Sequence, residues 1–263
     1  MSESLVLRSQ HGAVLTLTLN RPEKLNAFND DMSAELMRCF GDAQLDSSVR
    51  AVVLGGSGRG FSSGQDLEAF MRDKSEAKTS VADHLRHTYN RLVMQIRSLE
   101  KPVIASINGI AAGVGLSIAL CCDMRIAGDD AMLTLGFSKI GLIPDGGASF
   151  MLPLLAGFGR GLELAWSSDR IDAREAHRLG LVNRVVAAAD LVDETRAYAQ
   201  RFAEISPVAA GLTKRAFNRA MLPYFAHWLE EEAVLQEEAA GGPDLLEGVK
   251  SFMEKRKPAF AGR

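Results

Sequence analysis

An uncharged stretch at residues 102–122 limits what this chain can fold into more than any other feature. Its length is that of a membrane span. An asparagine and three glycines lie inside it, and each interior glycine would destabilise a lone helix by about 1 kcal/mol. The same residues can instead form a buried strand at 103–107, a glycine turn at 109–115 and a buried helix at 116–122. We therefore predict a buried strand–turn–helix unit and no membrane segment.

The rest of the first half alternates strands with helices. Residues 14–19 (VLTLTL) alternate apolar and polar side chains, which is typical of a strand with one buried face. Asn29 or Asp30 is placed to cap a helix that reaches about residue 45. Further strands are predicted at 51–56, 124–127 and 132–135, and a further helix at 84–99. Buried strands that alternate with helices indicate an α/β fold.

After Pro153 the pattern becomes helical. Apolar spacing predicts helices around 161–168, 173–180, 191–204, 207–220 and 224–239. No low-complexity linker marks a boundary, and we place a soft boundary near residue 200. Residues 1–200 are predicted to form an α/β core that carries the site, and residues 201–263 a helical C-terminal region.

Net charge and cysteine content indicate which ligands and which cellular compartment suit this protein. The 263 residues carry a formal net charge of −3, which does not suit a protein whose main ligand is nucleic acid. The three cysteines have no metal-ligand spacing, and adjacent Cys121 and Cys122 make a poor disulfide pair. Residues 1–12 lack the basic and apolar regions of a signal peptide. We expect a reduced, cytoplasmic protein that binds no nucleic acid.

Two glycine turns have the chemistry of an anion site. One is SGQDL at residues 63–67, and the other is GIAAGVG at residues 109–115. Glycine allows close approach of the backbone to a ligand, and the first N–H groups of a helix have no partner inside it. Two such groups aimed at one point would form an oxyanion hole. The alternative, two ordinary tight turns, is favoured by spacing alone, since neither matches a dinucleotide-binding or P-loop pattern.

Asp145 is the only carboxylate in FSKIGLIPDGG, residues 137–147. The proline before it and the glycines after it are typical of a turn, and Asp145 is also placed to cap a segment that begins at Gly146. In apolar surroundings, desolvation would raise the pKa of its carboxyl and make it a better base toward a carbon acid near neutral pH. The residues alone leave both roles open.

None of the five histidines lies in a nucleophile elbow or a metal-ligand spacing, which gives a hydrolase triad little support. His84 and His87 share one helix face, where the alternatives are a metal pair and, more simply, a solvated face. We predict no metal site.

Four segments together resemble the crotonase superfamily of enoyl-CoA hydratases and isomerases. They are VLTLTLNRPEKLNAFND, GRGFSSGQDL, KPVIASINGIAAGVG and EGVKSFMEKRKPAF, which extend over nearly the whole chain. The resemblance implies a spiral of ββα units, then a helical C-terminal region used for trimerisation, with trimers commonly pairing into hexamers. It also implies an acyl-CoA thioester as substrate, with coenzyme A as part of that substrate and no separate cofactor.

The resemblance also assigns candidate site residues. In the family the thioester oxygen lies between two backbone N–H groups, which here would belong to Gln65 and Val114. The loop at 21–27 and the stretch at 65–68 would hold the coenzyme A nucleotide, with basic residues at 255–257 reaching its phosphate. The expected substrate-binding residues are Lys24, Ala27, Gly64, Asp66, Leu67, Gly113, Phe137 and Leu142.

Departures from the family pattern bear on the reaction. Hydratases of the family carry two glutamates, at positions that fall on Ser117 and Phe137 in this chain. Neither residue offers a carboxylate, and addition of water needs placed groups to manage its protons. Asp145 instead falls where some isomerases and an aryl-CoA dehalogenase of the family carry their working aspartate. The resemblance therefore favours a functional Asp145.

We predict an acyl-CoA isomerase that forms a thioester enolate in the oxyanion hole. Asp145 would shift a double bond from the 3 to the 2 position, or assist rearrangement of a ring epoxide. Phe137 and Leu142 would form an apolar wall for the acyl group, and the segment at 73–80 would shape that pocket. The alternatives are a weak hydratase that uses Asp145 alone, nucleophilic displacement at an aryl-CoA, and a non-catalytic acyl-CoA binder.

Overall fold

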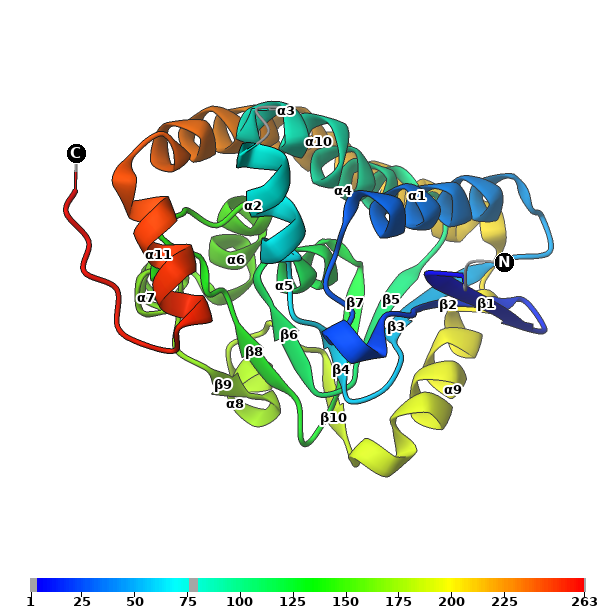
Figure 1. Ribbon diagram of the computed structural model, residues 1–263. Coiled ribbons are helices and arrows are strands. Elements are labelled where there is room, and N and C mark those ends of the chain that lie inside the picture. Colours follow the sequence, from blue (N-terminus) through cyan, green and yellow to red (C-terminus); the bar gives the residue numbers. More distant parts are fainter. Residues whose placement is uncertain (1–3, 76–79, 263) are drawn as a thin grey trace.

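The strands of the protein form two sheets in the computed structural model, which describes residues 4–75 and 80–262 (Figure 1). The larger sheet has the strand order β1-β2-β3-β5-β7-β10. In it, β1 is antiparallel to β2 and the other neighbours pair in parallel. Its strands are β1 (Val6–His11), β2 (Val14–Leu19), β3 (Ala51–Gly56), β5 (Val103–Ile107), β7 (Met124–Gly128) and β10 (Arg184–Val186).

The smaller sheet has the order β4-β6-β8-β9, in which β9 is the antiparallel strand. Its strands are β4 (Gly60–Ser62), β6 (Ile110–Ala112), β8 (Met132–Thr134) and β9 (Ile171–Asp172). Three times, a strand of the larger sheet is followed by a strand of the smaller sheet and then by a helical segment. This repeat is the expected spiral of ββα units, and the predicted crotonase-like α/β fold is confirmed.

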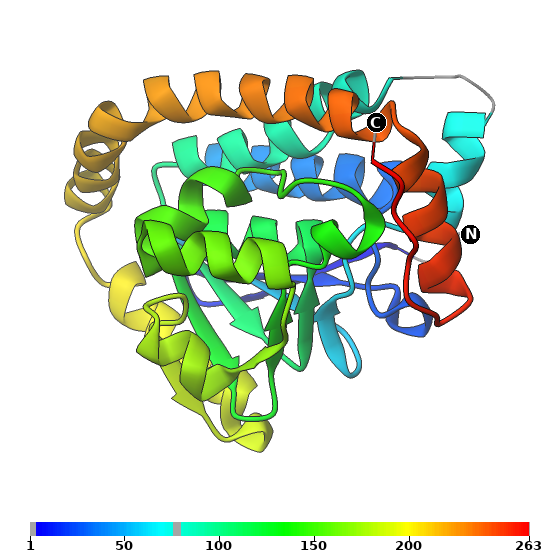
Figure 2. The ribbon, with the colours of Figure 1, turned by 90° about the vertical axis from the view of Figure 1, so that its left-hand side faces the viewer.

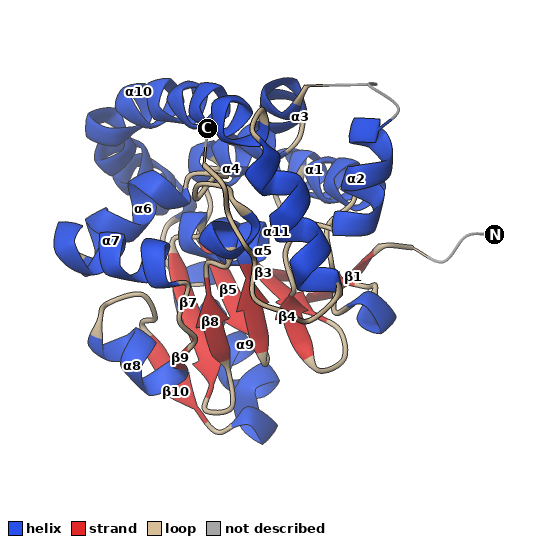
Figure 3. Cartoon of the chain, turned by 60° about the vertical axis from the view of Figure 1, so that its left-hand side comes forward, coloured by secondary structure: helices blue, strands red, loops and turns tan. Residues whose placement is uncertain are grey.

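Helices cover both faces of the larger sheet (Figure 3). The pleat of β3 sends Val52 and Leu54 to one face, where they join a cluster with α1 (Asp30–Leu45) and α4 (Tyr89–Ser98). It sends Ala51 and Val53 to the opposite face, against α9 (Leu191–Ala203). Burial of both faces explains why the central parallel strands β3 and β5 are short, almost continuously buried runs.

The remaining helices surround this core. Figure 2 shows α10 running along one side of the molecule. The helices are α2 (Leu67–Ser75), α3 (Val81–His87), α5 (Gly113–Cys121), α6 (Ala148–Ala156), α7 (Phe158–Ser167), α8 (Ala173–Arg178), α10 (Pro207–Ala240) and α11 (Pro243–Met253). Three short 3₁₀ helices join them: η1 (Pro22–Lys24), η2 (Phe137–Ile140) and η3 (Ala188–Asp190).

Most predicted elements are confirmed, but the predicted turn at 109–115 is wrong in part. Residues 110–112 form β6, because they pair with β4 and β8, and α5 begins at Gly113 rather than at 116. Glycine allows the positive φ of 78° at Gly109 and 51° at Gly113 that reverses the chain on either side of β6. The whole uncharged stretch therefore lies in β5, β6 and α5. Across the described residues, no helix is long and apolar enough to cross a membrane.

Two predicted helix boundaries are also wrong. The predicted helix at 84–99 is two helices, α3 and α4, which are interrupted at Thr88 with φ −115° and ψ −89°. The helices predicted at 207–220 and 224–239 are one helix, α10, with Pro223 inside it. Burial of Phe225 and Leu229 on α10 compensates for the hydrogen bond that a proline removes.

Several elements carry too weak a pattern to be predicted. β1 is an exposed edge strand with one buried side chain, so its residues do not alternate. β10 and β9 are only a few residues long. α2, α6 and α11 were also not predicted. In the segment at 73–80 that was predicted to shape the acyl pocket, residues 76–79 and the side chains of 73–75 lie outside the described part.

The boundary predicted near residue 200 falls inside α9, which packs against the larger sheet. The chain leaves that sheet at α10, where Ser206 caps the new helix by accepting from the N–H of Ala209. The division into two parts stays a prediction, and α10 contributes side chains to the site described below.

We expect Arg125→Met to destabilise the fold by about 3 kcal/mol, because it strands several buried carbonyls. Arg125 is 3 % exposed, and its guanidinium donates to carbonyls at the C-terminal end of α5 and to that of Leu181. Urea unfolding measures the change, and Arg174→Met on the exposed surface of α8 is the matched control. Equal unfolding midpoints for the two variants would contradict this role.

Candidate active site

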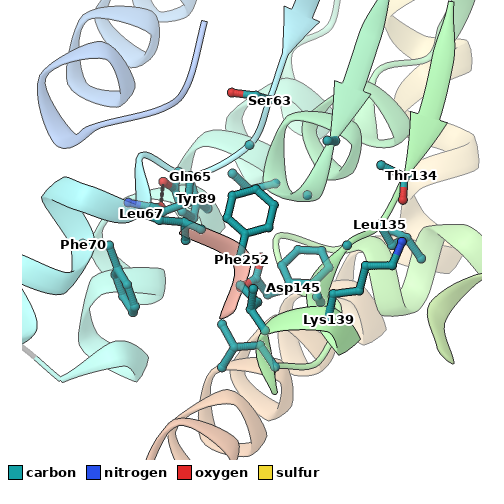
Figure 4. A pocket seen from close by; sticks show the side chains of 18 of the residues that line it. Ser63, Gln65, Leu67, Phe70, Tyr89, Thr134, Leu135, Lys139, Asp145 and Phe252 are labelled. Atoms are coloured by element: carbon teal, nitrogen blue, oxygen red, sulfur yellow. Dashed lines mark hydrogen bonds between the residues drawn. The ribbon is translucent and has the colours of Figure 1, made fainter. Parts of the chain in front are cut away.

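A cavity of about 320 Å³ lies where the two glycine turns meet η2 and the helices α2, α3, α4, α10 and α11. This is the volume of a small-molecule site. Its apolar lining includes Leu67, Phe70, Leu85, Tyr89, Val114, Leu135, Phe137, Leu142 and Phe252. Figure 4 shows Gln65, Leu67 and Tyr89 on one side of the cavity and Thr134, Leu135 and Lys139 on the other. The lining suits an apolar ligand group with one polar end.

The two glycine turns touch each other at one wall of the cavity. A Cβ placed on Gly64 would lie 3.0 Å from the carbonyl oxygen of Ala112 and 3.4 Å from Cα of Gly113, and the φ of Gly64 is 98°. The hydroxyl of Ser62 holds this turn, because it accepts from the N–H of Gly64 (3.1 Å) and donates to the carbonyl of Asn26 (2.8 Å). The close contact therefore requires glycine at Gly64, and the φ of 51° favours glycine at Gly113.

Two backbone N–H groups become available at this wall. Val114 lies in the first turn of α5, where an N–H has no acceptor inside the helix. Gln65 forms a parallel bridge with Phe28, in which the N–H of Phe28 donates to Gly64 and the N–H of Asp66 donates to Phe28. In such a bridge the N–H of Gln65 itself points away from Phe28. Because Gln65 and Val114 both line the cavity, the pair can stabilise a negative oxygen there.

Asp145 lies in the same cavity and is 6 % exposed. Its Oδ2 accepts a hydrogen bond of 2.7 Å from Nε2 of Gln236, while Oδ1 has no hydrogen-bond partner among the residues described. Burial raises the pKa of Asp145 to about 7, and the bond from Gln236 acts in the opposite direction. A carboxyl of this kind can take up and return a proton near neutral pH.

The predicted alternative, that Asp145 caps a helix beginning at Gly146, is wrong. α6 begins at Ala148 with Gly147 as its N-cap, and Glu232 of α10 accepts from the N–H groups of Gly147 and Ser149. The side chain of Asp145 is therefore left for the cavity, while its backbone carbonyl still closes the turn by accepting from Ala148.

Tyr89 and His84 also line the cavity, and sequence reasoning had not assigned them to the site. The hydroxyl of Tyr89 donates to Oε1 of Gln65, and its pKa is raised well above the usual value by burial and by the charge of Asp145. His84 packs edge-on against Tyr89 at 5.4 Å, and its Nδ1 lies 3.6 Å from Asp30. The predicted solvated face is thus wrong for His84, whereas His87 is exposed.

The predicted binding residues divide into two groups. Those that line the cavity are Gly64, Leu67, Gly113, Phe137 and Leu142. Lys24, Ala27 and Asp66 lie on the loops beside it. Arg21 joins these loops, because it donates to the carbonyl of Ala27 (2.6 Å) and to Oδ2 of Asp66 (2.9 Å). Lys24 forms an ion pair of 2.7 Å with Glu68.

Within the described part of the chain, no group of three or more histidine, cysteine, aspartate or glutamate side chains is placed to hold a metal ion.

Residues 9–263 match the family model described as enoyl-CoA hydratase/isomerase. The chain belongs to this family. It is 38% identical to the 1,2-epoxyphenylacetyl-CoA isomerase of Escherichia coli over the full length of both proteins. It is 34% identical to the short-chain-enoyl-CoA hydratase of Clostridium acetobutylicum, with 96% of this chain and 95% of that protein covered.

Solved structures of the enoyl-CoA hydratase/isomerase family agree with this placement. The crystal structure of an enoyl-CoA hydratase from Mycobacterium avium subsp. paratuberculosis superimposes with a TM-score of 0.87 at 34% identity, covering 98% of this chain and 99% of that one. The predicted family resemblance is confirmed. Relatives named as isomerases and as hydratases are both similar to this chain, so the names alone leave the reaction open.

We expect Gly64→Ala to lower turnover at least tenfold, because the new methyl group meets the carbonyl of Ala112 at 3.0 Å and the φ of 98° is unfavourable for alanine. The two turns would then move apart and misdirect the N–H of Gln65. The control is Gly159→Ala on α7, where a Cβ meets nothing within 4 Å. Steady-state assays compare the two, and an unchanged rate in Gly64→Ala would exclude the close contact as a requirement.

Proposed function

We propose that the protein is an acyl-CoA isomerase that moves a double bond from the 3 to the 2 position through a thioester enolate. The observation that carries this proposal is the buried Asp145, whose Oδ1 has no hydrogen-bond partner among the described residues and which lines one cavity together with Gln65 and Val114. The family itself contains enzymes of enoyl-CoA hydration and isomerisation. The full-length similarity to an epoxyphenylacetyl-CoA isomerase adds support.

In the proposed reaction, the thioester oxygen lies between the N–H groups of Gln65 and Val114. The carboxylate of Asp145 removes a proton from C2, so that the C2–H bond breaks and the electrons pass to the thioester oxygen as an enolate. Each backbone donor lowers the barrier by about 3 kcal/mol. The same carboxyl then delivers its proton to C4, and the enolate electrons reform the thioester carbonyl as the double bond settles at C2–C3. The cycle leaves Asp145 ionised again and needs no cofactor beyond the thioester.

A hydratase is the first alternative, and the lining of the cavity argues against it. Among the described lining residues, Asp145 is the one carboxylate. Ser117, at one position of a hydratase glutamate, is fully buried and donates to the carbonyl of Gly113 inside α5. Phe137, at the other position, is an apolar wall of the cavity. Orientation of water and transfer of two protons would fall to Asp145 alone.

The apolar wall favours an aromatic or medium-length acyl group, including a ring epoxide whose opening an enolate would assist. Phe70, Phe137 and Leu142 supply this wall. We place the coenzyme A nucleotide over Lys24, Ala27 and Asp66, beside the cavity. In the segment at 255–257, Arg256 is held by Glu247 and Glu254, so Lys255 and Lys257 are the proposed phosphate contacts.

We expect Asp145→Ala to lower isomerisation of a 3-enoyl-CoA by a factor of about 10² to 10⁴, because the base is lost. Appearance of the conjugated 2-enoyl thioester chromophore measures the rate. In the wild type, kcat/KM should rise with pH through about 7, because Asp145 has its pKa raised to about 7 and must be ionised to act.

Asp193→Asn is the control, because Asp193 is an exposed partner of Arg196 on α9, on the opposite face of the larger sheet. Coenzyme A binding should survive in Asp145→Ala. A wild-type protein that binds acyl-CoA but converts neither the 3-enoyl nor the epoxide substrate would support a non-catalytic acyl-CoA binder instead. A covalent aryl adduct on Asp145, detected by mass spectrometry, would support displacement.

We also propose that the protein assembles as a homotrimer or as a dimer of trimers. α7 and α10 leave large apolar side chains in solvent, which is unusual for a monomer. Phe158, Trp166 and Phe217 are each 73% exposed, and Tyr224 is 70% exposed.

Sedimentation velocity at micromolar concentration should give a mass of three or six chains. Trp166→Glu and Phe217→Glu should shift the protein toward the monomer, because each would place a charge in an apolar interface. Exposed Glu163→Gln on α7 is the control. A monomeric wild type would contradict the proposed assembly.

A further inference from the structure

The loop that carries Asp145 is held from behind by two buried polar side chains of α10. Glu232 and Gln236 are four residues apart, so they lie on one face of the helix. Glu232 is 2% exposed and Gln236 is fully buried. Both contact the loop at residues 143–149 and neither has a role in the reaction described above. Two polar groups buried together in this way need a reason beyond packing.

The orientation of Gln236 is fixed by the backbone of one loop residue, Ile143. Its Oε1 accepts from the N–H of Ile143 and its Nε2 donates to the carbonyl of Ile143, both at 2.9 Å. Only the amide oxygen can accept, so these two bonds fix which end of the amide is the NH₂ group. The same NH₂ group also donates to Oδ2 of Asp145 at 2.7 Å. This bond occupies Oδ2 and leaves Oδ1 without a hydrogen-bond partner among the described residues.

Glu232 is surrounded by donors. It accepts from the N–H of Gly147 (2.8 Å), the N–H of Ser149 (3.0 Å) and the hydroxyl of Ser149 (2.5 Å). Nε1 of Trp228 donates to the same hydroxyl, which commits the hydroxyl proton to Glu232. These groups form the N-terminal end of α6, where a negative charge is stabilised. Three donors therefore favour the ionised form of Glu232.

The two carboxyls thus have unequal environments. Asp145 has one donor, whereas Glu232 has three. Burial raises the pKa of each to about 7, and the two carboxyls repel each other when both are charged. The first proton lost therefore makes the second harder to lose. The larger number of donors around Glu232 favours Glu232 as the group that is charged first.

We propose that Glu232 and Gln236 are positioning residues that act on Asp145 in opposite directions. Gln236 fixes its carboxylate and stabilises the charged form, and the nearby charge of Glu232 favours the protonated form. This inference rests on the proposed role of Asp145 in moving a proton between two carbons. A base that must both remove and return one proton is most effective when neither form is strongly preferred.

Other titratable groups face this loop and do not replace Glu232. They are Tyr89 on α4, His84 on α3, Cys121 on α5, Lys139 on η2 and Arg170 just before β9. The pKa values of Tyr89 and Cys121 are raised far above neutrality by burial, so both stay uncharged. His84 is paired with Asp30, and Nζ of Lys139 donates to the carbonyl of Ser168. Glu232 is therefore the charge whose removal tests the proposal.

The experiment is a ¹³C NMR titration of the Asp145 carboxyl, assigned by its absence from Asp145→Asn. Glu232→Gln should lower the titration midpoint of Asp145, because it removes a like charge. Gln236→Met should raise it, because it removes the donor. We expect a shift of about one pKa unit in each direction, from the lost like charge in Glu232→Gln and from the lost hydrogen bond in Gln236→Met. Glu231→Gln, next to Glu232 but exposed, is the matched control and should leave the midpoint unchanged.

A merely structural role would move both midpoints in the same direction or not at all, and either result overturns the proposal. Should Glu232→Gln fail to fold, Ser149→Ala removes one donor from Glu232 and should also lower the midpoint of Asp145. The NMR readout needs no turnover, so it separates the two proposals. Shifted midpoints in an enzyme inactive on 3-enoyl-CoA would refute the isomerase and keep the coupling, whereas an active enzyme with unmoved midpoints would refute the coupling alone.

Discussion

The contact between the backbones of Gly64 and Gly113 is the constraint on which the rest of the site depends. A side chain on Gly64 would meet the carbonyl of Ala112 at 3.0 Å, so the two turns approach only because the side chains are absent. The spiral brings the ends of β4 and β6 together, and the turns follow those strands. Two N–H groups from segments about fifty residues apart can then serve one oxygen. The parallel pairing of β4 with β6 therefore brings the two backbone donors to one wall of the cavity.

Burial of Asp145 adds the second requirement. An isolated carboxylate in an apolar cavity is unfavourable, and the fold compensates with a single donor from α10 rather than with a cation. A cation would stabilise the charge too well and make the carboxylate a weak base. The C-terminal helices are thus part of the site, because α10 supplies Gln236 and α11 supplies Phe252 to the cavity. The predicted core of residues 1–200 does not complete the site by itself.

The sequence predicts the parts of this site that are local. Alternation at residues 14–19 and the apolar run at 103–107 identify strands, and the glycine turns and Asp145 carry patterns of a few residues. Gln236 and Glu232 carry no such pattern. They lie among neighbouring glutamates, and their partners Asp145 and Gly147 are 91 and 85 residues away. His84 was likewise misplaced, because helical spacing does not say which neighbour covers a face.

The number of carboxylates in the described cavity lining favours isomerisation over hydration. Hydration adds a molecule, so it needs a group for the water and a group for the carbon. Isomerisation adds nothing, and one carboxyl can remove the proton and return it. The cavity offers one carboxylate among its described residues, and Phe137 occupies the position where a second would stand. In the proposed reaction, an apolar wall there would also keep water away from the enolate, so that the proton returns to carbon rather than to solvent. Phe137 in place of a glutamate would therefore disfavour hydration and favour the proposed isomerisation.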